Sequence, residues 1–461
     1  MRDLLRLGVA ATVAGVLLVL PGPPGLPPAA QRVAALFAAC LVLWVTEAVP
    51  IAVTALAAVV LQPLLGVAPL PAAATNFISP VFFFVLAMFV IAQAFTHTGL
   101  DRRFACWLLA KAHGSTHRAV LLFMVGTAAM STVISDVPCC AVFMAVALGL
   151  FDKMGLTPGR SNFARAVMIG IPVASLIGGV GTPAGSSINI LGLSFIEQYG
   201  HVRVPFVHWM AIGLPMVVLL VPLAAAVILR CYPPEHDRIE GIDFAAELAH
   251  MGRLRPNEGR TLALVGVMLT LWIASSWQRD IDVVVVAVLG AAAMFLPGMG
   301  IFSSWKQAER GTAWDALLMI GSVTSLGAVS ASSGLAGWLV QGALGGMDTW
   351  PTWAVLATVS SFIVVVHLLV PVNPAIIAAM VPPIALLATS TGQNPALYGL
   401  PVVFTASCAF LLPLDAVPLV TYGKGYYRMF DMLRPGAIIS VAWVVLMTAL
   451  LLVIGPLLDL L

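Results

Sequence analysis

The stretch that decides the fold is Gly178-Gly179-Val180-Gly181-Thr182-Pro183-Ala184-Gly185-Ser186-Ser187-Ile188-Asn189. It interrupts an apolar run, residues 166–198, that is otherwise long enough to cross a membrane as a helix. Glycine adopts backbone conformations that end a helix, and proline donates no backbone hydrogen bond, so a continuous helix is not expected. A second apolar run, 396–423, is interrupted at Leu412-Pro413-Leu414-Asp415-Ala416-Val417-Pro418. We therefore predict two broken helices, 166–198 and 396–423.

The composition places these runs in a membrane. Of the 461 residues, 61% are hydrophobic and 9% are charged, and the mean hydropathy is +1.03, which excludes a soluble enzyme. The apolar runs are continuous, unlike the alternating strands of an outer-membrane barrel, and the length allows roughly ten to fourteen helical crossings. The net charge of +2 supplies no basic patch for nucleic acid. The fold class is therefore an all-α polytopic membrane protein that is surrounded by lipid.

About eleven of the apolar runs have the length of membrane-spanning segments. They are residues 5–20, 31–49, 51–66, 80–98, 166–198, 206–229, 261–278, 283–301, 314–341, 396–423 and 436–458. The first run follows a basic N-terminus, as in a signal peptide, but no convincing cleavage site follows it, so we expect a retained helix. Two further runs, 119–151 and 352–390, are each interrupted in the middle.

The lysine and arginine residues predict the orientation. With a cytoplasmic N-terminus, only Arg32, Arg203 and Arg279 of the 22 Lys and Arg residues fall outside. This distribution requires that 119–151 and 352–390 each enter and leave on one face, because a full crossing would reverse everything after it. We therefore predict two re-entrant hairpins in a multi-pass protein of the cell inner membrane. The first opens to the cytoplasm and the second to the outside.

The order of the predicted elements occurs twice. The hairpins have polar tips that contain proline, Ser135-Asp136-Val137-Pro138 and Pro371-Val372-Asn373-Pro374. Backbone groups without helical partners at mid-membrane must be buried in protein or line a wet cavity. A span, a hairpin, a broken span and a final span follow one another in 80–229 and again in 314–458. This order indicates an inverted-topology repeat, with a substrate site near the midplane where the repeats meet.

The chain divides accordingly into five regions. They are the N-terminal scaffold helices 1–79, the first repeat 80–229, a cytoplasmic loop 230–260, the linking scaffold helices 261–313 and the second repeat 314–461. A short local similarity supports the repeat, because Thr98-Gly99-Leu100 precedes the first hairpin much as Ser333-Gly334-Leu335 precedes the second.

The segment Trp44-Val45-Thr46-Glu47-Ala48-Val49-Pro50-Ile51-Ala52-Val53-Thr54 resembles the W-x-T-E-A-[IV]-P-x-x-V-T motif of the divalent anion:sodium symporters. The stretch Gly178 to Asn189 is similar to the glycine-rich break of that family, and the resemblance covers nearly the whole chain. It implies a sodium-coupled carrier of a dicarboxylate, citrate or sulfate. It also implies a homodimer whose scaffold domains stay fixed while each transport domain moves through the membrane as an elevator.

The chain departs from this family at the hairpin tips. The two Ser-Asn-Thr tips of the family correspond to Ser135-Asp136-Val137 and Val372-Asn373-Pro374, so only Ser135 and Asn373 match. Asp136 replaces the expected asparagine, and Asp415 lies in the second break, where the family usually has uncharged residues. These departures leave the transported anion and the coupling ion open.

Half-helix N-termini carry partial positive charge and free N–H groups, so converging ends can bind a carboxylate or sulfate without a lysine. Small residues let the backbone approach the anion, and hydroxyl and amide side chains supply donors. The alternative is that glycine and serine only allow close helix packing. The candidate substrate-binding residues are Ser135, Thr182, Pro183, Gly185, Ser186, Ser187, Asn189, Asn373 and Pro374.

Two aspartates near the bilayer centre need partners, because a charge there costs on the order of 2.5–3.5 kcal/mol. Sodium at Asp136 and at Asp415, with backbone carbonyls completing the shells, is one solution, and protonation is the other. The structural alternative is that each aspartate caps a broken helix or pairs with His367. Glu47 is expected to cap the helix that begins near Pro50. The candidate cation-binding residues are Asp136, Val137, Gly181, Asn189, Asn373, Asp415 and Ala416, and no cofactor other than the coupling ion is expected.

Two other classes of function were weighed against a symporter. An intramembrane enzyme needs a catalytic set at suitable spacing, and none is present in the sequence. A cation:proton antiporter of related architecture suits two midplane carboxylates, and a proton-coupled anion carrier is a further alternative. Uptake of a labelled dianion separates a symporter from an antiporter.

Overall fold

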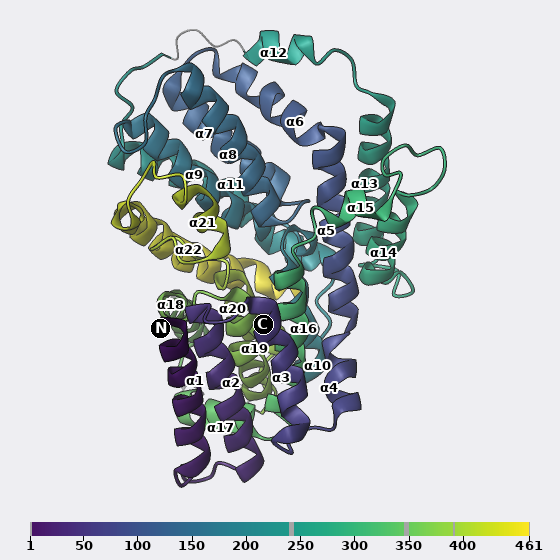
Figure 1. Ribbon diagram of the computed structural model, residues 1–461, viewed down its shortest axis with the longest axis vertical. Coiled ribbons are helices and arrows are strands. Elements are labelled where there is room, and N and C mark those ends of the chain that lie inside the picture. The colour runs from purple at the N-terminus through teal and green to yellow at the C-terminus, as the bar shows by residue number, and fades with distance from the viewer. Residues whose placement is uncertain (1, 239–243, 345–349, 391, 461) are drawn as a thin grey trace.

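The computed structural model describes residues 2–238, 244–344, 350–390 and 392–460 (Figure 1). These residues form helices and connecting segments, and no β-strand occurs among them. The predicted all-helical fold class is therefore confirmed.

The helices of the first half of the chain are α1 (Arg2–Val19), α2 (Pro28–Thr46), α3 (Ile51–Leu64), α4 (Leu70–Phe77), α5 (Pro80–Thr98), α6 (Leu100–Leu109), α7 (Thr116–Ser131), α8 (Asp136–Lys153), α9 (Asn162–Gly179), α10 (Ser187–Gly200) and α11 (Phe206–Cys231). Those of the second half are α12 (Phe244–His250), α13 (Pro256–Ala274), α14 (Val283–Ala293), α15 (Trp305–Glu309), α16 (Trp314–Ser332), α17 (Leu335–Leu344), α18 (Thr352–Leu369), α19 (Asn373–Ser390), α20 (Pro395–Thr405), α21 (Ala416–Tyr422) and α22 (Leu433–Ile454). The 3-10 helices include η1 (Ala110–Ala112), η2 (Pro183–Gly185), η4 (Met429–Met432) and η5 (Gly455–Leu458). The short helices α4, α6, α12 and α15 were not predicted from the sequence.

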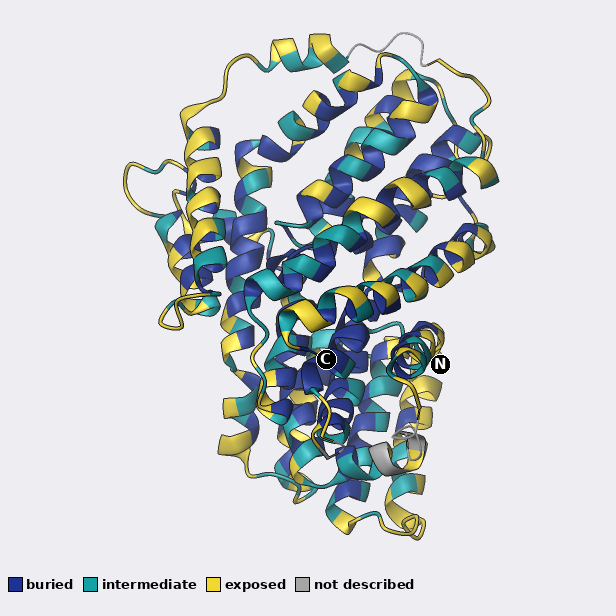
Figure 2. Cartoon of the chain, turned by 180° about the vertical axis from the view of Figure 1, so that it is seen from behind, coloured by how far each residue is buried: buried dark blue, intermediate teal, exposed yellow. Residues whose placement is uncertain are grey.

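The protein is a multi-pass membrane protein. Within the described residues, seven helical segments are long and apolar enough to cross a membrane, and they contain α2, α5, α9, α11, α16, α18 and α22. Figure 2 shows that buried residues gather between the helices and that exposed residues cover their outer faces. On α22 the exposed residues include Val441, Val445 and Val453, each more than 60% exposed. A bilayer accommodates such apolar outer faces, whereas water does not.

The element order of α5–α11 is repeated by α16–α22. Figure 1 shows that the α7–α8 pair lies in the upper half of the molecule and the α18–α19 pair in the lower half. The prediction of one span over 314–341 is wrong, because α16 ends at Ser332 and α17 begins at Leu335. The cause is Gly334, whose φ of +86° ends the helix in the left-handed region. Gly99, with φ +82°, separates α5 from α6 at the equivalent place.

The first helical break lies between α9 and α10 and is supported by α11. The indole Nε1 of Trp209 donates to the carbonyl oxygen of Val180 at 2.8 Å. Gly213 lies one turn further along α11, and a Cβ there would collide with the same oxygen. The uncoiled backbone at the break is therefore bonded and closely packed within the protein, as a membrane interior requires.

The second non-helical segment is longer than the interrupted stretch at 412–418, because α20 already ends at Thr405 and α21 begins at Ala416. The segment packs on α22, where a Cβ at Gly436 would collide with the carbonyl oxygen of Phe410. The indole of Trp443 donates to the hydroxyl of Thr405 at 3.3 Å. The chain therefore leaves the helical conformation at Thr405, before the proline-containing stretch, and the residues that follow contact α22.

Candidate functional site

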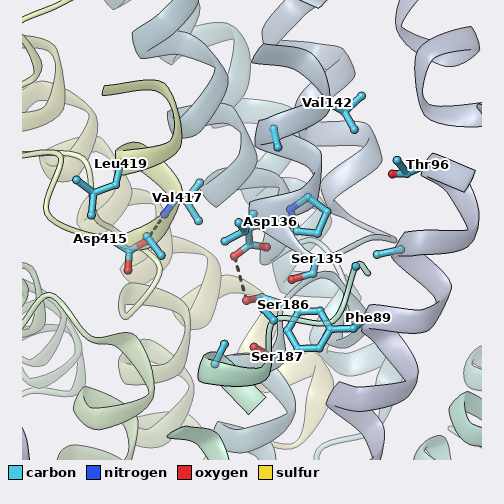
Figure 3. Close-up of a pocket in the computed structure, with 18 of the residues that line it drawn as sticks. Phe89, Thr96, Ser135, Asp136, Val142, Ser186, Ser187, Asp415, Val417 and Leu419 are labelled. Atoms are coloured by element: carbon cyan, nitrogen blue, oxygen red, sulfur yellow. Dashed lines mark hydrogen bonds between the residues drawn. The ribbon is translucent and has the colours of Figure 1, made fainter. Parts of the chain in front are cut away.

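A cavity of about 1120 Å³ lies where the two hairpin tips and the two breaks meet (Figure 3). The α8 side contributes Ser135 and Asp136, the α10 side contributes Ser186 and Ser187, and the second break contributes Asp415. Helices α2, α5 and α16 line the other wall. The packing of the half-helices brings these parts together, since α10 packs on α19 while α21 packs on α8. The second half-helix of each break thus contacts the hairpin of the other repeat.

Asp136 is the first residue of α8, and serine hydroxyls bind its buried carboxylate. The hydroxyl of Ser186 donates to Oδ2 at 3.0 Å, and the hydroxyl of Ser131 lies 3.4 Å from Oδ1. The carboxylate also lies against the backbone of Gly179, since a Cβ added there would be 2.9 Å from Cγ of Asp136. The first break therefore places the backbone of Gly179 and the hydroxyl of Ser186 beside a carboxylate.

Asn189 and Thr182 hold the first break in shape. The Asn189 amide Nδ2 donates to the carbonyl oxygens of Gly179 and Thr182, at 2.8 and 3.0 Å. The Thr182 hydroxyl donates to the carbonyl of Thr132 at 2.6 Å. The Oδ1 atom of Asn189 is buried and accepts no hydrogen bond from the described residues. The break thus contains an acceptor oxygen that lacks a donor.

The second tip and the second break form a similar arrangement. Oδ1 of Asp415 accepts a hydrogen bond from the backbone N–H of Val417 at 3.0 Å, so Asp415 caps α21. The side chain of Asn373, at the start of α19, interacts with the Asp415 carboxyl group. The Oδ1 atom of Asn373 is buried without a donor in the described part of the chain. Each tip, together with the break beside it, therefore contains a carboxylate and an amide oxygen without a donor in the described part of the chain.

The candidate residues fall into two groups. Those that line the cavity are Ser135, Asp136, Val137, Ser186, Ser187, Asn373, Pro374, Asp415 and Ala416. Those that lie behind its wall and are themselves buried are Gly181, Thr182, Pro183, Gly185 and Asn189. The second group contacts the backbone of the break and of the first tip, as the Thr182 and Asn189 hydrogen bonds show.

Two sequence interpretations of single residues were wrong. Glu47 does not cap α3, because it ends α2 in the left-handed region with φ +48°. The carboxylate of Asp315 instead accepts a hydrogen bond from the backbone N–H of Ala52 at 3.3 Å. His367 is buried, but neither of its ring nitrogens has a partner in the described residues, so it does not pair with an aspartate.

The cavity has more acidic than basic lining residues. Six carboxylates line it, and they belong to Glu47, Asp101, Asp136, Glu247, Asp315 and Asp415. Arg102 and Lys153 are the basic residues that line it among the described residues. Arg102, Lys153 and Glu247 are not recognisable as cavity residues from the sequence, because they meet only through contacts between residues far apart in the chain. No spacing or motif indicates such contacts.

The protein belongs to a family of secondary transporters. The sequence profile described as "Sodium:sulfate symporter transmembrane region" matches residues 2–461, so the chain is a member of this family. The resemblance to the divalent anion:sodium symporters is therefore confirmed.

Several named proteins are similar along most of their length. A membrane protein of Cupriavidus necator is 29% identical over 89% of this chain and 85% of that protein. An uncharacterized transporter of Haemophilus influenzae is 26% identical over 92% and 91% of the two chains. The sodium-dependent dicarboxylate transporter SdcS of Staphylococcus aureus is 25% identical over 89% and 82%.

Solved transporters share the fold at low sequence identity. The YdaH transporter of Alcanivorax borkumensis matches with a TM-score of 0.53 and 15% identity, covering 83% of this chain and 87% of that one. MtrF of Neisseria gonorrhoeae matches with a TM-score of 0.51 and 12% identity, covering 81% and 82%. These likenesses concern the architecture alone.

Proposed function

We propose that this protein is a sodium-coupled symporter that carries a small divalent anion, such as a dicarboxylate, citrate or sulfate, across the inner membrane. The observation that carries the proposal is that each tip and the break beside it contain a buried carboxylate and a buried amide oxygen that has no donor among the described residues. A hard cation is coordinated by oxygen atoms, and a carboxylate with carbonyl and amide oxygens supplies such ligands. The family and the sodium-dependent dicarboxylate transporter SdcS support sodium as this cation.

At the first tip, the proposed sodium ligands are the Asp136 carboxylate, Oδ1 of Asn189 and backbone carbonyls at Val137 and Gly181. At the second, they are Asp415, Ala416 and Oδ1 of Asn373. The buried, unpaired amide oxygens support these sets, because an unpaired acceptor in a buried site costs free energy that a bound cation offsets. Two bound cations also neutralise the carboxylates, which otherwise repel a dianion.

The proposed anion site lies in the cavity between the cation sites. The N-termini of α8, α10 and α19 lie at its wall, and their free N–H groups attract anions. Ser135, Ser186, Ser187, Asn373 and the backbone at Pro374 supply the direct contacts in this proposal. The buried residues Thr182, Pro183, Gly185 and Asn189 hold the break that positions them.

Transport by an elevator movement follows from the same proposal. The cavity is lined by the hairpin tips and breaks and also by residues of α2, α5 and α16, as expected if one group of helices slides past the other. We further propose that two chains form a homodimer in lipid. The scaffold helices of each chain, residues 1–79 and 261–313, would form the interface and stay fixed during transport. The lysine and arginine distribution supports a cytoplasmic N-terminus.

A proton-coupled carrier and a cation:proton antiporter are the competing proposals. The excess of carboxylates along the cavity favours them, because carboxylates can take up either protons or metal cations. The test is uptake of labelled succinate and sulfate into reconstituted vesicles, measured with sodium or choline and from about pH 5.5 to about pH 8.5, a range over which proton coupling would change the rate.

Sodium symport predicts uptake that requires sodium and that loses its steep sodium dependence in Asp136→Asn. Proton coupling predicts uptake that rises as pH falls and that loses this dependence in the same variant. The matched control is Asp282→Asn, because Asp282 caps α14 through backbone N–H groups and does not line the cavity. Uptake that ignores both ions would contradict the coupling proposal, and no uptake of either dianion would contradict the proposed substrate class.

A further inference from the structure

The mouth of the cavity carries a cluster of charged side chains formed by Arg102, Lys153 and Glu247. Arg102 lies on α6, Lys153 ends α8 and Glu247 lies on the short helix α12. Nη2 of Arg102 is 2.7 Å from Oε1 of Glu247, and Nζ of Lys153 is 3.5 Å from Oε2. All three line the cavity. One carboxylate therefore bridges the two basic side chains that border the cavity in the described part of the chain.

The segment that carries Glu247 is held independently of this cluster. Arg103 pairs with Glu258 at 3.1 Å, and both side chains are largely buried. Arg103 also donates to the carbonyl oxygens of Gly252 and Met251, at 2.8 and 3.1 Å. These contacts hold the chain directly after α12 against α6, so Glu247 is not the contact that anchors this part of the segment.

The bridge itself is weak enough to exchange. The side chains of Arg102 and Lys153 are 66% and 56% exposed, and exposed ion pairs contribute little to stability. The Arg102 guanidinium, with a smaller contribution from Lys153, holds the pKa of Glu247 below its usual value, so this carboxylate is ionised at neutral pH. The cluster thus consists of two cations around an anion that can move away.

We propose that Arg102 and Lys153 form a second anion-binding site, at the mouth of the cavity, for the carboxylate or sulfate group of the transported anion. Glu247 occupies this site as an internal anion, and an arriving or departing substrate displaces it. Arginine and lysine together suit an oxyanion, because the guanidinium binds two oxygens and the ammonium adds a point charge. That the ligand is the transported anion rests on the proposed function. That the mouth is cytoplasmic rests on the predicted orientation.

Nearby charges fit this role. Asp101 also lines the cavity. Its Oδ1 accepts a hydrogen bond from the backbone N–H of Arg102 in the first turn of α6, so this carboxylate is bonded within its own helix. Lys111 lies in η1, directly after α6. Its ammonium is 3.5 Å from the ring centre of Trp107, and it does not line the cavity. Lys111 therefore provides a matched control cation.

The test is the binding of inorganic sulfate to the purified full-length protein in sodium-free choline buffer of constant ionic strength. Thermal unfolding at increasing sulfate gives a half-saturating concentration. Without sodium the proposed central site does not hold an anion, so this binding reports the mouth. Glu247→Gln removes the competing charge and should lower the half-saturating concentration about three- to tenfold, the effect of one unit charge in a water-accessible site. Lys111→Gln should leave it unchanged.

Loss of the basic pair gives the opposite result. Arg102→Gln with Lys153→Gln in the Glu247→Gln background should abolish saturable stabilisation by sulfate and leave only the gradual effect of an excluded salt. Arg102→Lys keeps the charge and should retain saturable binding, which separates charge from a folding defect. Sulfate binding that is equal in wild type and Glu247→Gln, or that survives loss of both cations, would overturn the proposal. Because the variants lie at the mouth and outside the proposed central site, failure of this assay is distinguishable from failure of the uptake experiments that test the proposed function.

Discussion

Gly179→Ala provides a direct test of the proposed cation site at Asp136. The added methyl group would collide with Oδ1 of Asp136 and lie 2.9 Å from its Cγ, whereas an ordinary contact is 3.4–4 Å. The carboxylate must therefore move by about 1 Å. If an oxygen–cation distance lengthens from ~2.4 to ~3.2 Å at an effective dielectric of about 20, the attraction weakens by about 1.7 kcal/mol. We expect the sodium concentration for half-maximal uptake to rise about 20-fold.

The assay is sodium-dependent uptake of a labelled dianion in reconstituted vesicles, with thermal unfolding of the purified protein as the folding check. Gly266→Ala on α13 is the matched control, because a Cβ there meets no atom within 4 Å. In an Asp136→Ala background the collision is absent, so Gly179→Ala should have no further effect on sodium dependence. Wild-type sodium dependence in the folded Gly179→Ala variant would refute the assignment of Asp136 as a cation ligand.

Three further predictions concern the second site, the topology and the first break. Asn373→Ala and Asp415→Asn should each abolish uptake while leaving the thermal unfolding temperature nearly unchanged, and near wild-type uptake by both variants would contradict the second cation site. Single cysteines at the exposed positions 117 and 157 should both react with an impermeant reagent from the cytoplasmic face. Labelling of the two positions from opposite faces would contradict the prediction that 119–151 is a re-entrant hairpin. Trp209→Phe should destabilise the protein by about 1–3 kcal/mol, measured as a lower unfolding temperature, because it leaves the buried carbonyl of Val180 without its donor.

The sequence by itself determined the class of the fold. Long apolar runs with few charges leave helices as the backbone structure that satisfies its own hydrogen bonds in lipid. Glycine and proline at residues 178–185 indicated the end of α9, because both residues act on the local backbone. The repeated order of spans and hairpins was also accessible, since it depends on hydropathy and on the placement of lysine and arginine.

The two aspartates at the site were accessible from the sequence for a similar reason. Placing a carboxylate inside an apolar membrane segment costs free energy however the chain folds, so the sequence alone indicates that Asp136 and Asp415 have a role. The sequence did not distinguish residues that line the cavity from those behind it. Ser186 and Asn189 are three residues apart, yet Ser186 lines the cavity and the Asn189 amide binds the backbone of the break. Which side of a bent segment faces the cavity depends on the helices packed around it.

Only the tertiary structure decided the extent of the second break and the charges at the mouth of the cavity. Residues 406–411 contain no proline or glycine, and the close approach of α22 at Gly436 accompanies their departure from the helix. Arg102 and Glu247 are 145 positions apart and meet because α12 packs on α6. Local sequence acts through the torsions of a few neighbouring residues. Contacts between distant segments depend on the whole packing arrangement, and no single stretch of sequence encodes them.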